Sequence, residues 1–114
     1  MHELSIAKRI IDKASELREE YQASKIIKIY IKIGALSGVE QENLHFCYNI
    51  LIEGMDEFKE SQLIIEEKEW IVKCNNCGTE YNPDVHLLLC PGCQMNSSTL
   101  ISGDELDFVS LEVE

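Results

Sequence analysis

Residues 74–93, CNNCGTEYNPDVHLLLCPGC, contain two Cys-x-x-Cys pairs separated by twelve residues. The pairs are Cys74 with Cys77 and Cys90 with Cys93. This spacing is typical of a site in which four thiolates hold one metal ion, because each pair turns two sulfur atoms toward the ion and the loop folds back to join them. Four thiolates complete a tetrahedron, so the pattern predicts a closed, structural site without an open catalytic position.

The cysteine spacing predicts the four ligands but does not identify the metal. We expect zinc, but a rubredoxin-like iron centre uses the same four ligands, and the spacing does not distinguish the two metals. Two disulfides are another explanation of the four cysteines. No stretch resembling a cleaved signal peptide precedes them, however, and Cys47 makes the number of cysteines odd. The sequence therefore favours a shared metal ion over disulfides.

The composition restricts the class of partner. With 114 residues, 45% of them hydrophobic, the chain can bury one modest core. Its 10 basic and 21 acidic residues give a formal charge of −11, which opposes the binding of nucleic acid through counterion release. No apolar run approaches the roughly eighteen residues of a membrane span. We expect a soluble, cytoplasmic protein that binds neither nucleic acid nor membrane.

The first third of the chain predicts a helix followed by a strand. Apolar residues recur at steps of three and four, the period of an amphipathic helix. They are Leu4, Ala7, Ile10, Ile11, Ala14, Leu17 and Tyr21. From Ile27 to Ile33, isoleucine then alternates with lysine and tyrosine before Gly34. This period of two predicts a strand with one buried face.

A second helix is predicted between Ser37 and Gly54. The segment SGVE at residues 37–40 has the form of a capping box, in which Ser37 and Glu40 satisfy the first amides of the helix. Apolar residues follow at helical spacing, namely Leu44, Cys47, Tyr48 and Leu51. The cap accounts for Glu40, and the alternatives are contact with a partner or a role in positioning the amino terminus.

Two further strands are predicted at Leu63–Trp70 and Phe108–Val113. In the last strand, Val109, Leu111 and Val113 are expected to face the core. The cysteines lie between these two strands in the sequence, so the metal-binding segment is expected to be an insertion between strands of one sheet.

The predicted fold class is therefore α/β, a small domain of two helices and a three-stranded sheet with an inserted four-cysteine zinc-ribbon lobe. The α/β domain is expected to comprise residues 1–69 and 104–114, and the lobe residues 70–103.

The start of the chain, Met1-His2-Glu3, supplies an unusual set of metal ligands at the beginning of the first helix. The terminal amine, the His2 amide nitrogen and the His2 imidazole can chelate one ion, which leaves a place for Glu3 or a distant side chain. Such nitrogen-rich planar sets favour Ni(II) or Cu(II) over zinc. The first amides of a helix also lack intrahelical acceptors. Taken alone, however, these residues are better explained as an inert helix end.

Four segments together carry a resemblance to a known family. They are MHELSIAKRI at residues 1–10, GALSGVE at 34–40, the cysteine pairs within 74–93, and GDELDFVSLEVE at 103–114. In this combination the chain resembles the HypA/HybF family of hydrogenase-maturation nickel metallochaperones along its whole length. The resemblance implies a nickel-binding α/β domain that contains both termini, and a zinc-ribbon domain inserted before the final strand.

The resemblance also implies roles for particular residues. Nickel is bound by Met1, His2 and Glu3, through the Met1 amine, the backbone nitrogens of His2 and Glu3, and the His2 imidazole. The four cysteines hold structural Zn(II). Ni(II) is a transferred cargo that is delivered to the large subunit of nickel–iron hydrogenase with the help of the GTPase HypB, and in some bacteria to urease. No bond-making chemistry is predicted, so we do not expect an enzyme.

The main alternative is a zinc-ribbon adaptor that binds another protein without transferring nickel, with Met1 to Glu3 as an inert helix end. His86, in the loop between the cysteine pairs, is a secondary candidate as a ligand to either metal, although an ordinary loop histidine is the favoured explanation. We expect a monomer or a weak homodimer.

Overall fold

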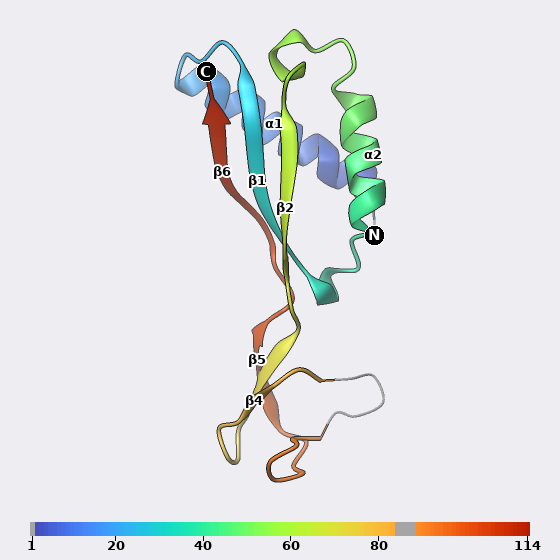
Figure 1. Cartoon of the computed structure of the whole chain (residues 1–114), viewed down its shortest axis with the longest axis vertical. Coiled ribbons are helices and arrows are strands. Elements are labelled where there is room, and N and C mark those ends of the chain that lie inside the picture. Colours follow the sequence, from blue (N-terminus) through green and yellow to red (C-terminus); the bar gives the residue numbers. More distant parts are fainter. Residues whose placement is uncertain (1, 84–88) are drawn as a thin grey trace.

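The computed structural model describes residues 2–83 and 89–114, which form two three-stranded sheets along an elongated molecule of 55 × 25 × 17 Å (Figure 1). Met1 and residues 84–88, which include His86, lie outside the described residues. The elements in chain order are α1 (Glu3–Glu20), β1 (Ile26–Gly34), the 3₁₀ helix η1 (Ala35–Ser37), α2 (Gln41–Leu51), the 3₁₀ helix η2 (Asp56–Phe58), β2 (Gln62–Lys68), β3 (Ile71–Cys74), β4 (Glu80–Tyr81), β5 (Ser98–Ser102) and β6 (Leu106–Val113).

The first sheet has the strand order β2-β1-β6. β1 is its central strand and pairs in parallel with β2 and antiparallel with β6. Both helices cover the same face of this sheet (Figure 1). The alternation predicted for β1 is present from Ile29 to Ile33, whose isoleucines are buried in the core with Leu44 and Tyr48 of α2. At the start of the strand Ile26 is buried in place of the predicted Ile27, because the pairing with β6 shifts register there. The second sheet has the order β4-β3-β5 and contains Cys74. The sequence predicted a lobe here but not its individual strands.

The predicted α/β class, with two helices, a three-stranded sheet and a four-cysteine lobe, is confirmed. The cysteine-containing sheet lies between β2 and β6 in the chain, as expected of an insertion. Among the described residues, neither helix has the combination of length and apolar character that crossing a bilayer requires.

The buried stripe of α1 differs from the predicted one at both ends. The residues that it buries are Glu3, Ile6, Ala7, Ile10, Ile11 and Ala14. Leu4 is exposed because it lies beside this stripe on the helix, and Tyr21 is exposed because it follows the last helical residue. Glu3 lies at the first position of the buried stripe, although it is charged.

The capping box predicted at residues 37–40 is wrong. Helix α2 begins at Gln41 after Glu40, and the Glu40 side chain makes no capping hydrogen bond. The Ser37 hydroxyl instead accepts a hydrogen bond from the Val39 amide at 3.2 Å. Ser37 ends the 3₁₀ helix η1 and is followed by a left-handed residue, Gly38. This turn places Ser37 too early in the chain to cap the helix.

The facing predicted for the last strand is also partly wrong. Val109 is 48% exposed and Val113 is exposed, whereas Phe108 and Leu111 pack against the core. Neighbouring β1 residues pair with Phe108 and Ser110, so Val109 is an extra residue in β6. Such a β-bulge interrupts the alternation of inward and outward side chains.

The two sheets are joined by backbone hydrogen bonds at the end of β1. The amide of Gly34 donates to the carbonyl of Glu105 at 2.8 Å, and the amide of Leu36 donates to the carbonyl of Gly103 at 2.6 Å. The Gly103 amide donates to the Glu105 carboxylate at 2.7 Å, and this bond lowers the pKa of Glu105. The returning chain is thus held on β1 as it leaves β5 and enters β6.

This junction leaves no room for side chains at its two glycines. A Cβ atom on Gly34 would overlap the carbonyl group of Gly103. Gly103 itself has a φ of +125° and packs against the backbone and side chain of Trp70, in the segment that leads out of β2. The close approach of these backbones fixes where the second sheet begins.

We expect Gly34→Ala to lower the free energy of unfolding by at least about 2 kcal/mol, because the added methyl group meets backbone atoms that cannot rotate away. Chemical denaturation measures the change. Gly54→Ala is the control, since its φ is +81° but its surroundings are open, and it should cost about 1 kcal/mol. Equal losses in the two variants would contradict the tight junction.

Candidate metal sites

The four predicted cysteines come together at the far end of the second sheet. Cys74 is the last residue of β3, and Cys77 lies in the turn that follows it. Cys90 and Cys93 lie in a turn before β5. The four sulfur atoms all lie within 4.8 Å of one another. Tertiary structure thus groups all four predicted ligands, while Cys47 lies on α2, partly buried against the main core.

Each cysteine pair forms the same kind of turn. The amides of Asn76 and Gly92 donate to the sulfur two residues before them, at 3.4 Å to Cys74 and 3.3 Å to Cys90. These bonds hold the first sulfur of each pair in place and support negative charge on it. The two halves of the site are therefore built alike, although their sequences differ.

The distances between sulfur atoms fit a tetrahedral metal site. The Sγ atoms of Cys74 and Cys93 are 3.5 Å apart, as are those of Cys77 and Cys90. A zinc–sulfur bond of about 2.3 Å gives an edge of about 3.8 Å in a regular tetrahedron. A disulfide would require about 2.05 Å. The arrangement therefore fits a tetrathiolate metal site and not a pair of disulfides.

The surroundings of the sulfur atoms favour the thiolate form of Cys77 and Cys74. Hydrogen bonds from the side chain and the backbone amide of Thr79 lower the pKa of Cys77 to about 6. The amide of Cys77 is the main group that lowers the pKa of Cys74. Burial raises the pKa of Cys90. The hydrogen bonds from Thr79 therefore favour the thiolate of Cys77, which is the form that binds metals. The sequence analysis missed Thr79, although it lies only two residues from Cys77.

The start of α1 presents His2 to solvent beside a fixed Glu3. His2 is exposed and precedes the first helical residue, and its carbonyl accepts the Ile6 amide at 3.1 Å. The His2 imidazole makes no capping hydrogen bond to the helix. Met1, the third residue predicted to bind nickel, lies outside the described part of the chain.

The side chain of Glu3 binds the start of α2. Its carboxylate accepts a hydrogen bond from the Asn43 side chain at 3.0 Å and one from the Glu40 amide at 3.4 Å. Burial would raise the pKa of Glu3, but hydrogen bonds from its own amide, Glu40 and Asn43 outweigh this effect and lower it. Glu3 therefore ties the start of α1 to the start of α2.

The capping explanation for Glu40 is wrong, and the contact with Glu3 is made by the backbone amide of Glu40. Any residue other than proline would supply that amide, so a role for the Glu40 side chain stays a prediction. Asn43 was not singled out in the sequence. No local signal connects Asn43 with Glu3, because the two residues are 40 positions apart.

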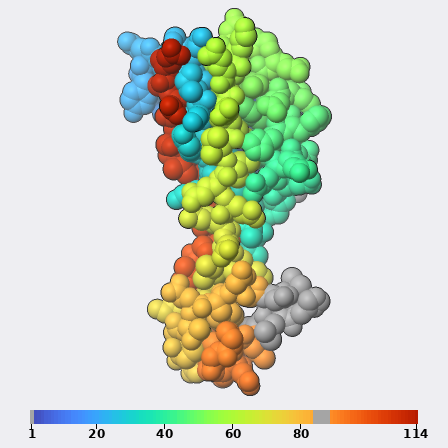
Figure 2. All heavy atoms as spheres, in the orientation of Figure 1, coloured from blue at the N-terminus to red at the C-terminus, as the bar shows by residue number. Residues whose placement is uncertain are grey.

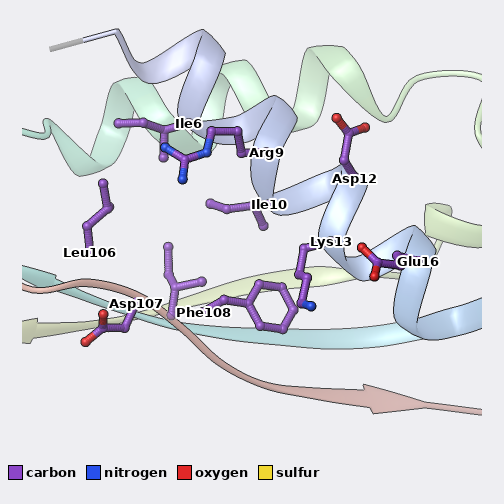
Figure 3. A pocket seen from close by; sticks show the side chains of 10 residues that line it. Ile6, Arg9, Ile10, Asp12, Lys13, Glu16, Leu106, Asp107 and Phe108 are labelled. Carbon is purple, nitrogen blue, oxygen red and sulfur yellow. The ribbon is translucent and has the colours of Figure 1, made fainter. Parts of the chain in front are cut away.

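A separate hollow of about 440 Å³ lies between α1 and the β6 side of the sheet (Figure 3). Ile10 and Phe108 are among its apolar walls, and Arg9 and Lys13 project from α1 along it. No residue predicted to bind metal lines this hollow. The candidate metal sites are therefore at the start of α1 and in the cysteine cluster.

Comparison with known proteins places these sites in a family. A family model described as "Hydrogenase/urease nickel incorporation, metallochaperone, hypA" matches residues 1–113. The chain belongs to the HypA family. A protein called hydrogenase maturation factor HypA from Chloroflexus aggregans is 41% identical over 113 residues, which cover 98% of each chain. Its counterpart from Aquifex aeolicus is 35% identical over 114 residues, covering 100% of this chain and 98% of that protein.

Two solved structures share the fold. The solution structure of the Ni metallochaperone HypA from Helicobacter pylori has a TM-score of 0.66 at 24% identity, covering 99% of this chain and 97% of that one. A second solution structure, of a HypA protein, has a TM-score of 0.74 at 23% identity, covering 100% and 97%. At this level of identity the likeness supports the HypA fold and not individual residue roles.

We expect removal of the metal to unfold the second sheet and leave the first intact. Among the described residues of this lobe, few side chains are buried, and these include Val72, Cys74, Pro83 and Cys90. A bound metal therefore supplies most of the stability of the lobe. Amide hydrogen exchange before and after chelation measures this, and Cys77→Ser should have the same effect. Cys47→Ala is the matched control and should keep the metal. Loss of protection in β1 on chelation would contradict this prediction.

We expect Glu3→Ala to speed amide exchange at Glu40 and in the first turn of α2, because the Glu40 amide loses its acceptor. Glu3→Gln keeps an acceptor oxygen and should have a smaller effect. Glu42→Ala, which removes an exposed carboxylate from the same turn, is the control. Identical exchange rates in Glu3→Ala and the unaltered chain would show that the contact is not formed in solution.

Proposed function

We propose that this chain is a nickel metallochaperone that binds Ni(II) at its free amino terminus and delivers it for maturation of nickel–iron hydrogenase, and of urease where that enzyme is present. The ligands are the Met1 amine, the backbone nitrogens of His2 and Glu3, and the His2 imidazole. Membership of the HypA family, whose model describes nickel incorporation, is the observation that carries this proposal.

The local structure around His2 supports this ligand set. The imidazole is exposed, and the first amides of α1 have no acceptor within the helix. The Glu3 carboxylate is occupied by Asn43 and Glu40, so Glu3 contributes its backbone nitrogen and not its carboxylate. A chelate of few exposed ligands suits a protein that must release its ion to a client.

The remaining assignments follow the same proposal. Residues 1–69 and 104–114 form the nickel-binding domain, and residues 70–103 form a zinc-ribbon domain in which the four cysteines hold Zn(II). The tetrahedral sulfur geometry supports a structural ion held by four thiolates, and zinc is the metal that we propose for it. The partners are a HypB-type GTPase and the hydrogenase large subunit, in the cytoplasm. The chain transfers an ion by ligand exchange and is not an enzyme.

We expect zinc-loaded protein with an authentic amino terminus to bind about one Ni(II), measured by isothermal titration calorimetry. His2→Ala and an extension by about four residues before Met1 should each weaken nickel binding by more than about tenfold, because the first removes the imidazole and the second moves the terminal amine out of chelating reach of His2. Affinity should fall in acid, since binding displaces protons from the amine and amides.

His45→Ala is the matched control for His2→Ala, because it removes a partly buried histidine from α2 and should leave nickel binding unchanged. Glu3→Gln should also retain nickel, in contrast to a variant that removes a ligand. Equal affinity in the unaltered, His2→Ala and extended chains would overturn the nickel assignment. A zinc-ribbon adaptor that only binds other proteins would then be the better explanation.

A further inference from the structure

Helix α2 carries an exposed apolar pair on the side that faces away from the sheet. Leu44 and Tyr48 are buried against the core, whereas Phe46 is 62% exposed and Ile50 is 47% exposed. Side chains four residues apart are neighbours on a helix surface, so the two form one patch. In Figure 2 the green residues of α2 form one flank of the molecule. Exposed apolar residues are ordinary when they stand singly, and aromatic side chains are enriched among the residues that carry binding energy in interfaces.

A hollow of about 390 Å³ lies at the carboxyl-terminal end of α2, lined by residues from Asn49 to Lys59, so it begins within one turn of Ile50 in the sequence. Ile52 and Met55 give it apolar walls, and Glu53 and Asp56 place carboxylates on it, with Lys59 as the basic residue. The carboxyl-terminal end of a helix also carries partial negative charge. The hollow therefore suits the side chain of a lysine or arginine, whose aliphatic stem packs on the apolar walls while its charge meets the carboxylates.

The acidic residues around the patch argue against a second copy of this chain as the occupant. Glu42 lies one turn before Phe46, and Glu53 follows Ile50 on the same side. Antiparallel contact between two α2 helices would place Glu42 of one copy near Glu53 of the other, and parallel contact would place like residues together. Both arrangements set like charges against each other, in a chain of net charge −11.

We propose that Phe46, Ile50 and the adjoining hollow form a docking surface for a basic amphipathic helix of another protein. This partner helix places two apolar side chains, four residues apart, against Phe46 and Ile50, and a lysine or arginine in the hollow beside Glu53. The 11 residues of α2 span about 16 Å, which matches about three turns of the partner. The surface does not include His2 or any cysteine, so the proposal does not depend on nickel binding.

The test uses a stapled helical peptide of about fourteen residues, because short unstapled helices are only marginally stable in water. It carries two leucines four residues apart and lysines around them. A second peptide has glutamate in place of every lysine. Each is titrated into the zinc-loaded, isotope-labelled full chain, and the backbone amide shifts are followed by NMR. The lysine peptide should shift amides of residues 42–56 with an affinity that falls as salt is added.

Substitutions locate the contact. Phe46→Ala should weaken binding of the lysine peptide by about tenfold or more. Glu53→Gln with Asp56→Asn should weaken it and reduce its salt dependence. Tyr21→Ala is the matched control, because Tyr21 is another exposed aromatic, 71% exposed at the end of α1, and its loss should leave binding unchanged.

Several outcomes overturn the proposal. These are failure of the lysine peptide to bind, equal binding of the glutamate peptide, shifts confined to other parts of the chain, or unchanged affinity in Phe46→Ala. Sedimentation that shows α2-dependent dimers of the unaltered chain would also overturn it, since the face would then bind a second copy. Nickel titration of Phe46→Ala should give the affinity of the unaltered chain, which separates this proposal from the proposed function.

Discussion

The pairing of β1 with two strands that flank the cysteine lobe in the sequence holds this molecule together. β2 runs parallel to β1 and leads out to the lobe, and β6 runs antiparallel to β1 and leads back from it. The isoleucines of β1 are buried under two helices, so the pairing is stabilised by the hydrophobic core of the first sheet. The lobe is consequently attached at both ends to a sheet that does not need it for its own core.

The two ends of the molecule are stabilised by different means. The first sheet has a continuous cluster of buried apolar side chains, and the second has few such residues around its four cysteines. A bound metal compensates for a small core by replacing many weak contacts with a few strong bonds. Between the two, the packing of Gly34, Gly103 and Trp70 makes a tight junction.

At the start of the chain, the Glu3 side chain is held in place and the neighbouring His2 side chain is exposed. Glu3 is tied to α2 by Asn43 and the Glu40 amide, while His2, one residue earlier, is open to solvent. A chelate built on such a base gains orientation without being enclosed, which is what reversible transfer of an ion requires. The outward face of α2 lies on the same helix that anchors Glu3, so binding of a partner there and order at the amino terminus involve a common element.

Spacing between residues that are close along the chain is enough to predict the two helices, the central strand and the four cysteines as one set of ligands. Packing between distant segments sets the rest, because it leaves α2 uncapped by Ser37, bulges Val109 out of β6 and binds Glu3 to the start of α2. It also decided that Phe46 lies exposed, since the sheet covers the opposite side of its helix. The physical reason is that local periodicity determines which side chains share a face. Which faces meet depends on packing between segments far apart in the chain.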